Sequence, residues 1–394
     1  MVSRLQKFAV SALSLTMLFG GVVTAARAQE PNAAESSLTL LSAGEGAAFA
    51  MSNRTNGNQI VTYRRAANGA LTRVGTVSTR GNGIGTDLDT QGALRLSSDH
   101  RFLYAANAGS DDVTVFAVNG TKLTFLQKIY AGDVPNSLTM RGNLLYVLVG
   151  SVAGNGILGF KRAGNGTLTP LADSFRDLSS PIAVPGQIEF SPDGRLLLVT
   201  QKTTNELLPP PNAIDVFTVD SAGFASAVPN RNASHGVRPF SMAFRDNDDL
   251  LVVEAFNAAP EASALSSYKV ASDASLDVIS GSVPNQQTDA CWIVITEDGR
   301  NAFVANFGSG TISSYAIDSA GAISLVDGDA AFTGLTSQPV DLALSVDSQY
   351  LYLLLRGTGG VASFKIDDNG ALSPLGIVTG GLPVADGASG LAVY

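Results

Sequence analysis

Cysteine is almost absent from this chain, which has one cysteine among 394 residues. A single thiol, Cys291, cannot form an internal disulfide, so the folded state must be stabilised by burial of apolar side chains. Hydrophobic residues make up 45% of the chain, and a chain of this length can bury a large core. A free thiol usually packs as a small apolar side chain, and Cys291 is interpreted in that way, with a nucleophile as the alternative.

Histidine and the motifs of common catalytic sites are also scarce. The two histidines, His100 and His235, form neither a His-x-His nor a His-Glu-x-x-His arrangement, so no zinc site is expected. No Gly-x-Ser-x-Gly segment supports a serine hydrolase. The stretch TDLDTQG (residues 86–92) lacks the Gly-Lys pair of a phosphate loop, and Ser98 stands where a calcium loop needs glutamate. The sequence therefore predicts no metal and no cofactor.

Basic residues are outnumbered by acidic ones. The chain has 25 Lys and Arg residues against 34 Asp and Glu residues, a formal charge of −9. Such a chain repels a phosphate backbone and gives no attraction to anionic lipid, and it has no basic stripe with interleaved aromatic residues. Nucleic acid is therefore not expected as a partner.

Long hydrophobic runs are missing except at the N-terminus. Arg4 and Lys7 precede an apolar run over residues 8–24, and a small-x-small cleavage site, Ala-Arg-Ala, follows it. This pattern predicts a secretory signal peptide over residues 1–28. The alternative, a membrane anchor, is disfavoured because the run is short for a span. We expect export to the periplasm or the cell exterior, no membrane contact after cleavage, and a flexible tether over residues 29–44.

The stretch QGALRLSSDHRFLYAANAGSDDVTVFAVNGTKLTF (residues 91–125) is the unit that the rest of the chain repeats. Leu94 and Leu96 alternate with their neighbours as in a strand, and polar turns separate them from a second strand over residues 102–106 and a third that begins at Val113. A four-stranded meander of this kind cannot bury both of its faces alone. It therefore needs neighbours stacked on each side, as in a propeller.

Apolar pairs with one residue between them mark the first strand of each repeat. They are Leu94 and Leu96, Leu138 and Met140, Ile188 and Phe190, Met242 and Phe244, Ile293 and Ile295, and Leu342 and Leu344. The anchors of the second strands are Tyr104, Tyr146, Leu198, Leu251, Phe303 and Tyr352. Their spacing of about 50 residues is closer to a kelch-like period than to the shorter WD-type period.

The C-terminal segment supplies the strand that the first repeat lacks. The earliest unit, from Ala47, has three strands and no first strand, whereas Leu391 and Val393 look like a first strand that nothing follows. Pairing them closes a ring and removes the free sheet edges. The predicted fold is all-β: a seven-bladed β-propeller of four-stranded antiparallel blades over residues 45–394, completed by the C-terminal strand. Seven blades are favoured over six or eight, and a large β-sandwich would not explain the missing strand.

The candidate site follows from this fold, because the loops that lead into the first strands gather at one mouth of the channel, where ligands commonly bind. These loops hold most of the useful polar groups, with Trp292 as an apolar wall: Asn136, Gln187, His235, Arg238, Asp289, Asp341 and Asp386. Glu254, deeper in its blade, stands in an otherwise apolar strand. A buried carboxylate without a partner is costly, so Glu254 is expected to have a partner or a catalytic role.

The predicted roles are those of a site for an anionic or lactone-bearing ligand. Glu254 is predicted as general acid or base, and Arg238 as the group that steadies negative charge. The predicted ligand-binding residues are His235, Gln187, Asp289, Trp292 and Asp341. The alternatives are an ion pair at the rim for Arg238 and a solvated loop position for His235.

Several segments resemble the seven-bladed β-propeller lactonase family. They are LSSDHRFLYAANAGSDDVTVFAV, SPDGRLLLV, ACWIVITEDGRNAFVANFGSGTISSYAID and PVDLALSVDSQYLYLLL. The family is related to propeller-type bacterial 6-phosphogluconolactonases and to fungal carboxymuconate-lactonizing enzymes, so the resemblance implies a propeller that opens lactone rings. It extends over essentially all of the chain after the tether.

The catalytic pattern that the resemblance implies is only partly present. Where members with lactone chemistry have His-Pro-His, this chain has Val184, Pro185 and Gly186. The family's Pro-Arg-His aligns with Pro239, Phe240 and Ser241, and its Asn-Arg pair aligns with Asn306 and Phe307. The family's acidic residue finds a counterpart in Glu254, one or two positions out of register.

The sequence thus predicts an exported lactonase-family propeller that hydrolyses a small sugar or carboxylated lactone at the channel mouth. The alternative is a non-catalytic propeller that binds a ligand or a protein, with the triple-proline segment TTNELLPPPNA as a candidate rim element. A monomer is expected, and the sequence identifies no protein partner.

Overall fold

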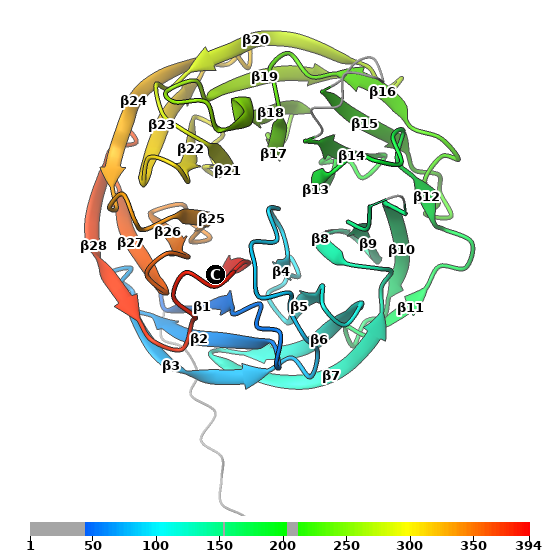
Figure 1. Ribbon diagram of the computed structural model, residues 1–394, viewed down its shortest axis with the longest axis horizontal. Coiled ribbons are helices and arrows are strands. Elements are labelled where there is room, and N and C mark those ends of the chain that lie inside the picture. Colours follow the sequence, from blue (N-terminus) through cyan, green and yellow to red (C-terminus); the bar gives the residue numbers. More distant parts are fainter. Residues whose placement is uncertain (1–43, 153, 203–211) are drawn as a thin grey trace, which may run out of the picture. The chain divides into compact units, whose positions relative to one another are not determined.

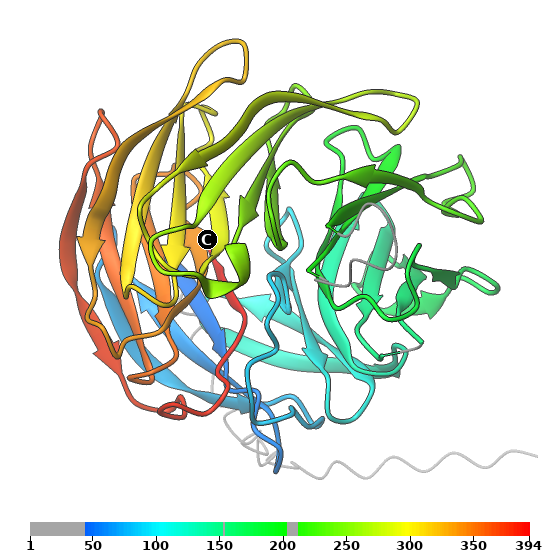
Figure 2. The same cartoon turned by 45° about the horizontal axis from the view of Figure 1, so that its top comes forward.

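The computed structural model describes residues 44–152, 154–202 and 212–394. The chain divides into Met1–Thr39 and Leu40–Tyr394, and everything below concerns the second unit. The predicted signal peptide, most of the tether and most of the triple-proline segment lie outside the described residues. Seven antiparallel sheets form a ring around a central channel (Figure 1, and in a tilted view Figure 2). The predicted all-β, seven-bladed propeller is confirmed.

The first three blades contain β1 to β12 and the last strand of the chain. Blade 1 consists of β29 (Leu391–Val393), β1 (Gly46–Met51), β2 (Gln59–Arg65) and β3 (Leu71–Ser78). Blade 2 consists of β4 (Leu94–Leu96), β5 (Phe102–Asn107), β6 (Asp112–Asn119) and β7 (Lys122–Tyr130). Blade 3 consists of β8 (Pro135–Arg141), β9 (Leu144–Val149), β10 (Gly156–Arg162), β11 (Leu168–Pro170) and β12 (Arg176–Asp177). Both β11 and β12 pair with β10, so the outer edge of blade 3 is formed by two short strands.

The other four blades have four strands each. Blade 4 consists of β13 (Pro185–Phe190), β14 (Leu196–Gln201), β15 (Ala213–Thr218) and β16 (Asn230–Ala233). Blade 5 consists of β17 (Pro239–Phe244), β18 (Asp249–Glu254), β19 (Ala264–Val270) and β20 (Leu276–Pro284). Blade 6 consists of β21 (Ala290–Ile295), β22 (Asn301–Asn306), β23 (Thr311–Ile317) and β24 (Ile323–Phe332). Blade 7 consists of β25 (Pro339–Leu344), β26 (Tyr350–Leu355), β27 (Gly360–Ile366) and β28 (Leu372–Thr379).

Burial explains why the second strand of each blade is so apolar. Every residue of β5, β14 and β18 is buried, because these strands face a neighbouring blade on both sides. The outer strands β7 and β28 have largely exposed residues instead. In the described residues, helical structure is limited to the 3₁₀ turn η1 (Phe256–Ala258). None of these residues belongs to a helix long and apolar enough to cross a bilayer.

The ring is closed by the C-terminal strand, as predicted. In antiparallel register, β29 pairs with β1, with Ala48 opposite Val393 and Ala50 opposite Leu391. The Tyr394 amide donates to the Ala47 carbonyl at 3.0 Å, which extends the ladder beyond the strand. The two ends of the propeller therefore share one sheet, and β29 covers the inner edge of β1.

Buried tyrosines of the second strands form hydrogen bonds to the next blade. Tyr104 donates its hydroxyl hydrogen to the Gly166 carbonyl of the next blade at 2.8 Å, and Tyr352 donates to Gly69 at 2.9 Å across the closure. Each acceptor lies in the turn between the third and fourth strands of the next blade. The ring is thus held by directional bonds as well as by apolar packing.

Candidate functional site

The segment that precedes β4 crosses one mouth of the channel. We call residues 86–92 the plug, and we call this opening the linker mouth, because the links between blades lead through it into the first strands. Figure 1 shows the chain before β4 reaching into the centre of the ring. From the sequence, this stretch is expected to be a loop that meets the other linkers at the channel mouth. That it crosses the opening was not predicted.

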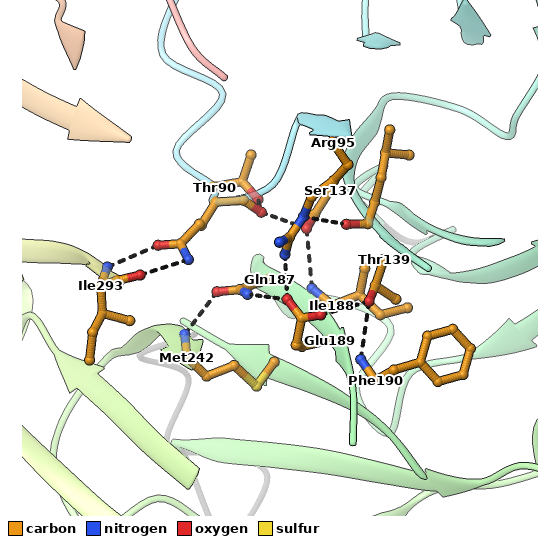
Figure 3. A network of polar contacts seen from close by, with 12 residues as sticks. Thr90, Arg95, Ser137, Thr139, Gln187, Ile188, Glu189, Phe190, Met242 and Ile293 are labelled. Carbon is orange, nitrogen blue, oxygen red and sulfur yellow. Dashed lines mark hydrogen bonds and ion pairs between the residues drawn. The ribbon is translucent and has the colours of Figure 1, made fainter. Parts of the chain in front are cut away.

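Hydrogen bonds fasten the plug to blades on the far side of the channel. Trp292 donates its indole N–H to the Thr90 carbonyl at 2.9 Å, and the Thr90 hydroxyl donates to the Gly186 carbonyl. The Gln91 amide nitrogen donates to the Ile293 carbonyl at 3.0 Å, and its oxygen accepts from the Ile293 amide at 2.9 Å (Figure 3). The predicted apolar wall, Trp292, is buried, and it supports the plug.

Three cations from three blades meet the carboxylates of the plug. Lys202 Nζ lies 2.6 Å from Asp89 Oδ2, and Arg238 Nη2 lies 3.5 Å from the same oxygen. Arg356 Nη1 lies 2.6 Å from Asp87 Oδ2. The Lys202 side chain is 2% exposed, against 26% for Arg238 and 37% for Asp89. Solvent therefore reaches this cluster on the side of Arg238 and Asp89.

Burial changes the ionisation of two further groups in the mouth. Desolvation raises the pKa of Asp289, and the positive charge of Arg238 opposes the rise. Desolvation also raises the pKa of Cys291 well above its ordinary value, so this thiol stays neutral. The Cys291 Sγ atom lies 3.5 Å from Asp289 Oδ1. Among the predicted residues, Arg238 and Asp289 are thus brought into one electrostatic cluster with Lys202.

Glu254 lies in a different environment. It is fully buried, and it accepts hydrogen bonds from the Gly236 amide at 2.7 Å, from Ser266 Oγ at 2.5 Å and from Ser282 Oγ at 2.6 Å. His235 is exposed, and its Nδ1 atom lies 2.9 Å from Ser282 Oγ. The structure therefore groups His235 with Glu254 through a serine, apart from the ion pairs of the plug.

The internal repeat gives Glu254 a structural counterpart in other blades. It is the last residue of the second strand of blade 5, as Asn107 is in blade 2 and Asn306 is in blade 6. Asn107 donates to Thr114 Oγ1 at 2.9 Å, and Asn306 donates to Ser313 Oγ at 2.8 Å. Each partner hydroxyl, like that of Ser266, stands on the third strand two residues beyond the position opposite. Glu254 thus occupies a brace position that recurs in the fold.

Gln187 and Asp341 lie in the channel wall. Gln187 is buried, donates to Glu189 Oε2 at 3.0 Å and accepts from the Met242 amide at 2.8 Å (Figure 3). Asp341 accepts from the Gly390 amide at 2.6 Å. Burial raises the pKa of Asp341 to about 7, against the effect of that hydrogen bond. The ligand-binding roles predicted for both residues stay predictions.

Sequence reasoning missed Lys202, Arg356 and the plug carboxylates. Lys202 and Arg356 each follow directly after a second strand, where blades 2 and 5 have Ala108 and Ala255. The signal available in the sequence was a basic residue directly after an apolar strand, at Lys202 and at Arg356. The described residues include no group of three or more His, Cys, Asp or Glu side chains placed to hold a metal ion.

Comparison with known proteins assigns the family. The family model described as lactonase, 7-bladed beta-propeller, matches residues 55–185 and 254–338, more than half of the chain. The chain belongs to this lactonase family. No curated protein matches the chain. The predicted family membership is therefore confirmed at the level of the family.

Solved structures share the fold of this lactonase-family propeller. A candidate 6-phosphogluconolactonase from Bacteroides fragilis is 18% identical, with a TM-score of 0.68, over 89% of this chain and 98% of that chain. The periplasmic gluconolactonase PpgL of Pseudomonas aeruginosa is 16% identical, with a TM-score of 0.66, over 89% of this chain and 99% of that chain. A Lactobacillus plantarum protein is 17% identical, with a TM-score of 0.67, over 89% of this chain and 99% of that chain. At these identities the likeness concerns the fold alone.

Two cations of the lactonase-family propeller stand over aromatic rings at positions that the family resemblance singles out. Phe240 and Phe307 take the places where the resemblance puts arginines. Lys202 Nζ lies 4.4 Å from the centre of the Phe240 ring, and the Arg356 guanidinium carbon lies 4.8 Å from the centre of the Phe307 ring. Positive charge is thus present beside both positions, although it comes from other residues.

Proposed function

We propose that this propeller binds a small sugar or carboxylated lactone at the linker mouth and opens its ring by hydrolysis. The observation that carries the proposal is the pair of cations over Phe240 and Phe307. Lys202 and Arg356 supply the positive charge that the resemblance assigns to arginines at those two positions. Family membership supports the reaction class, and the partly exposed Arg238 gives a ligand access to the cluster.

In the proposed reaction, Asp289 acts as the general base. Its carboxylate takes a proton from a water molecule, whose oxygen attacks the lactone carbonyl carbon. Arg238, which solvent reaches, stabilises the developing oxyanion, and the buried Lys202 adds its positive charge without direct contact. The bond from the carbonyl carbon to the ring oxygen breaks, and the ring oxygen takes the proton. The raised pKa makes the Asp289 carboxylate a stronger base than an ordinary aspartate.

The geometry favours Asp289 over Glu254 for this step. Three hydrogen bonds from its own blade and linker hold the Glu254 carboxylate in a brace position. Asp289 instead shares the electrostatic field of Arg238, Asp89 and Lys202. Glu254 was the sequence-based choice of catalytic residue, and the test below compares the two.

Lactone hydrolysis by the wild type, Asp289→Asn and Glu254→Gln provides the test, with a panel of sugar and aliphatic lactones. We expect Asp289→Asn to lower kcat about a hundredfold or more, because a general base is worth that order of magnitude. Glu254→Gln keeps kcat within a few-fold and melts at a lower temperature. Loss of turnover in a folded Glu254→Gln variant, with Asp289→Asn active, would refute the assignment of the base.

A second candidate function is a non-catalytic propeller that binds a ligand or a protein. It is favoured by Val184, Pro185 and Gly186 at the position of His-Pro-His, since the Gly186 carbonyl there accepts a hydrogen bond from the plug. The absence of turnover by the wild type for every lactone in the panel would leave this second function. Export, a periplasmic or extracellular location and a monomeric state are part of both proposals. Detection of the protein in the producing cell's cytoplasm with residues 1–28 intact would refute export.

A further inference from the structure

A chamber lies in the channel on the other side of the plug from the linker mouth. Its volume is about 360 Å³, and Arg95, Glu189, Phe190, Met242 and Ile293 are among the lining residues. It opens beside Arg141, the last residue of β8, and beside Ser191 and Asp246, in the turns that join the first two strands of blades 4 and 5. We call this opening the turn mouth.

Gln91 closes the inner end of the chamber. It lines the cavity, and both polar atoms of its side chain are bound to the backbone of Ile293. Ser137 also donates its hydroxyl hydrogen to the Gln91 carbonyl at 2.6 Å. These bonds fix the plug to opposite walls, so the plug lies between the chamber and the linker mouth.

Arg95 offers the chamber unused hydrogen-bond donors. Its Nε atom donates to the Leu138 carbonyl at 2.9 Å, and one Nη group forms an ion pair with Glu189 (Figure 3). A guanidinium has five N–H groups, and among the described residues Arg95 has no further hydrogen-bond partner, although its charge also acts on the Asp341 carboxylate. The same side chain lines two adjoining cavities of about 170 and 250 Å³.

Glu189 does not compete fully for these donors, because other groups already bind its carboxylate. Thr139 Oγ1 donates to Glu189 Oε1 at 2.8 Å, and Gln187 Nε2 donates to Oε2 at 3.0 Å (Figure 3). The remaining donors of Arg95 thus suit a second carboxylate. The neighbouring cavity contains Asp341, and the negative charge that Asp341 carries above about pH 7 disfavours a ligand with two negative groups.

We propose that this chamber binds small monocarboxylates, with the carboxylate on Arg95 and an apolar body against Phe190 and Met242. A bidentate pair with guanidinium gives such a ligand its orientation, and the aromatic and thioether side chains accept a flat apolar group. This site is separate from the proposed lactone site, since Gln91 and the rest of the plug lie between them.

Methionine methyl NMR of the full chain with benzoate tests the proposal. Met140 and Met242 line the chamber, whereas Met51 is buried in blade 1. We expect benzoate to shift the methyl signals of Met140 and Met242 in a saturable manner and to leave Met51 unchanged. Benzamide has a similar shape but carries no charge. We expect it to bind at least about tenfold more weakly than benzoate, because it forms no charge-assisted pair.

Variants distinguish recognition of benzoate by Arg95 from non-specific binding. The double variant Arg95→Gln/Glu189→Gln removes both charges together, so no buried charge is left unpaired, and it weakens benzoate binding about tenfold or more. Arg176→Gln, in blade 3 and away from the chamber, is the matched control and leaves binding unchanged. Signal assignment by single Met→Leu variants identifies each methyl group.

Three outcomes would overturn the proposal. They are equal binding of benzoate and benzamide, unaltered binding by the double variant, and the absence of any saturable shift at Met140 and Met242. The indole N–H signal of Trp292, the single tryptophan, reports on the linker mouth. A benzoate response at Trp292 alone would refute the chamber and leave the lactone site standing, whereas failure of the lactone panel would leave the chamber untouched.

Discussion

Replacing Asp341 by asparagine should remove a pH-dependent loss of stability. Asp341 is 3% exposed, and burial raises its pKa from 3.8 to about 7 in the folded protein. The folded state therefore binds the proton more tightly than the unfolded state does. As pH rises from about 4 to about 7, the free energy of unfolding falls, and above that range the loss is complete.

The size of the loss follows from the difference in pKa. A difference of about 3 units at about 1.4 kcal/mol per unit corresponds to about 4 kcal/mol. Asparagine keeps an oxygen for the Gly390 amide and carries no charge, but its new N–H groups need partners. We therefore expect Asp341→Asn to raise the free energy of unfolding by about 2 to 4 kcal/mol at pH 8 and to change it little at pH 5.

Urea denaturation of the wild type and Asp341→Asn between pH 5 and pH 9 measures this effect. Asp99→Asn is the control. A hydrogen bond from Ser97 lowers the pKa of Asp99, so its stabilising contribution is lost only in more acidic solution and its removal leaves the slope between pH 5 and pH 9 unchanged. Parallel pH profiles for the wild type and Asp341→Asn would refute the reasoning.

Three further predictions concern closure, blade contacts and the plug. Deletion of residues 387–394 removes β29 and exposes the edge of β1, so we expect aggregation in size-exclusion chromatography; a monomer with the wild-type melting temperature would contradict this. Tyr146→Phe leaves a buried carbonyl and a buried amide unpaired and should lower the free energy of unfolding by about 1 to 3 kcal/mol. The control Tyr130→Phe, at an exposed position, should change it by less than about 0.5 kcal/mol. Equal effects of the two variants would argue against the hydrogen bonds of the Tyr146 hydroxyl. Asp89→Asn leaves the buried Lys202 cation short of its counter-ion and should cost about 3 kcal/mol, which the double variant with Lys202→Met should largely restore; calorimetry that finds no such recovery would count against the ion pair.

The fold was predictable because the sequence patterns that specify it are local and recur in each repeat. Alternation of apolar and polar residues identifies strands, and the apolar pairs that open each repeat recur in six blades. The closure followed from a missing strand at one end and a surplus strand at the other. Blade 3 shows the limit of such patterns, because its outer edge breaks into β11 and β12, and no feature of residues 168–177 was recognised as a break.

The candidate site was less predictable, because it depends on which linker crosses the channel. The plug has the composition of an ordinary loop, and its partners include Lys202, Arg238, Trp292 and Arg356, from four blades that are remote in sequence. Glu254 shows the opposite case. The apolar strand around it correctly indicated a partner, and the hydroxyl of Ser266 is one. Asn107 and Asn306 occupy the same position in two other repeats. An alignment of the repeats would therefore have indicated a structural role for Glu254 from the sequence alone.

The plug also constrains how this architecture can evolve. In repeat architectures most contacts join only adjacent repeats, so a repeat can be added or removed with few other changes. Here a short segment reaches from the first linker to Gly186, Trp292 and Arg356. Because these partners lie on blades 4, 6 and 7, we expect a ring with one blade more or fewer to displace at least one of them from the plug. The plug thus favours seven blades from within the channel, in addition to the closure of the ring by β29.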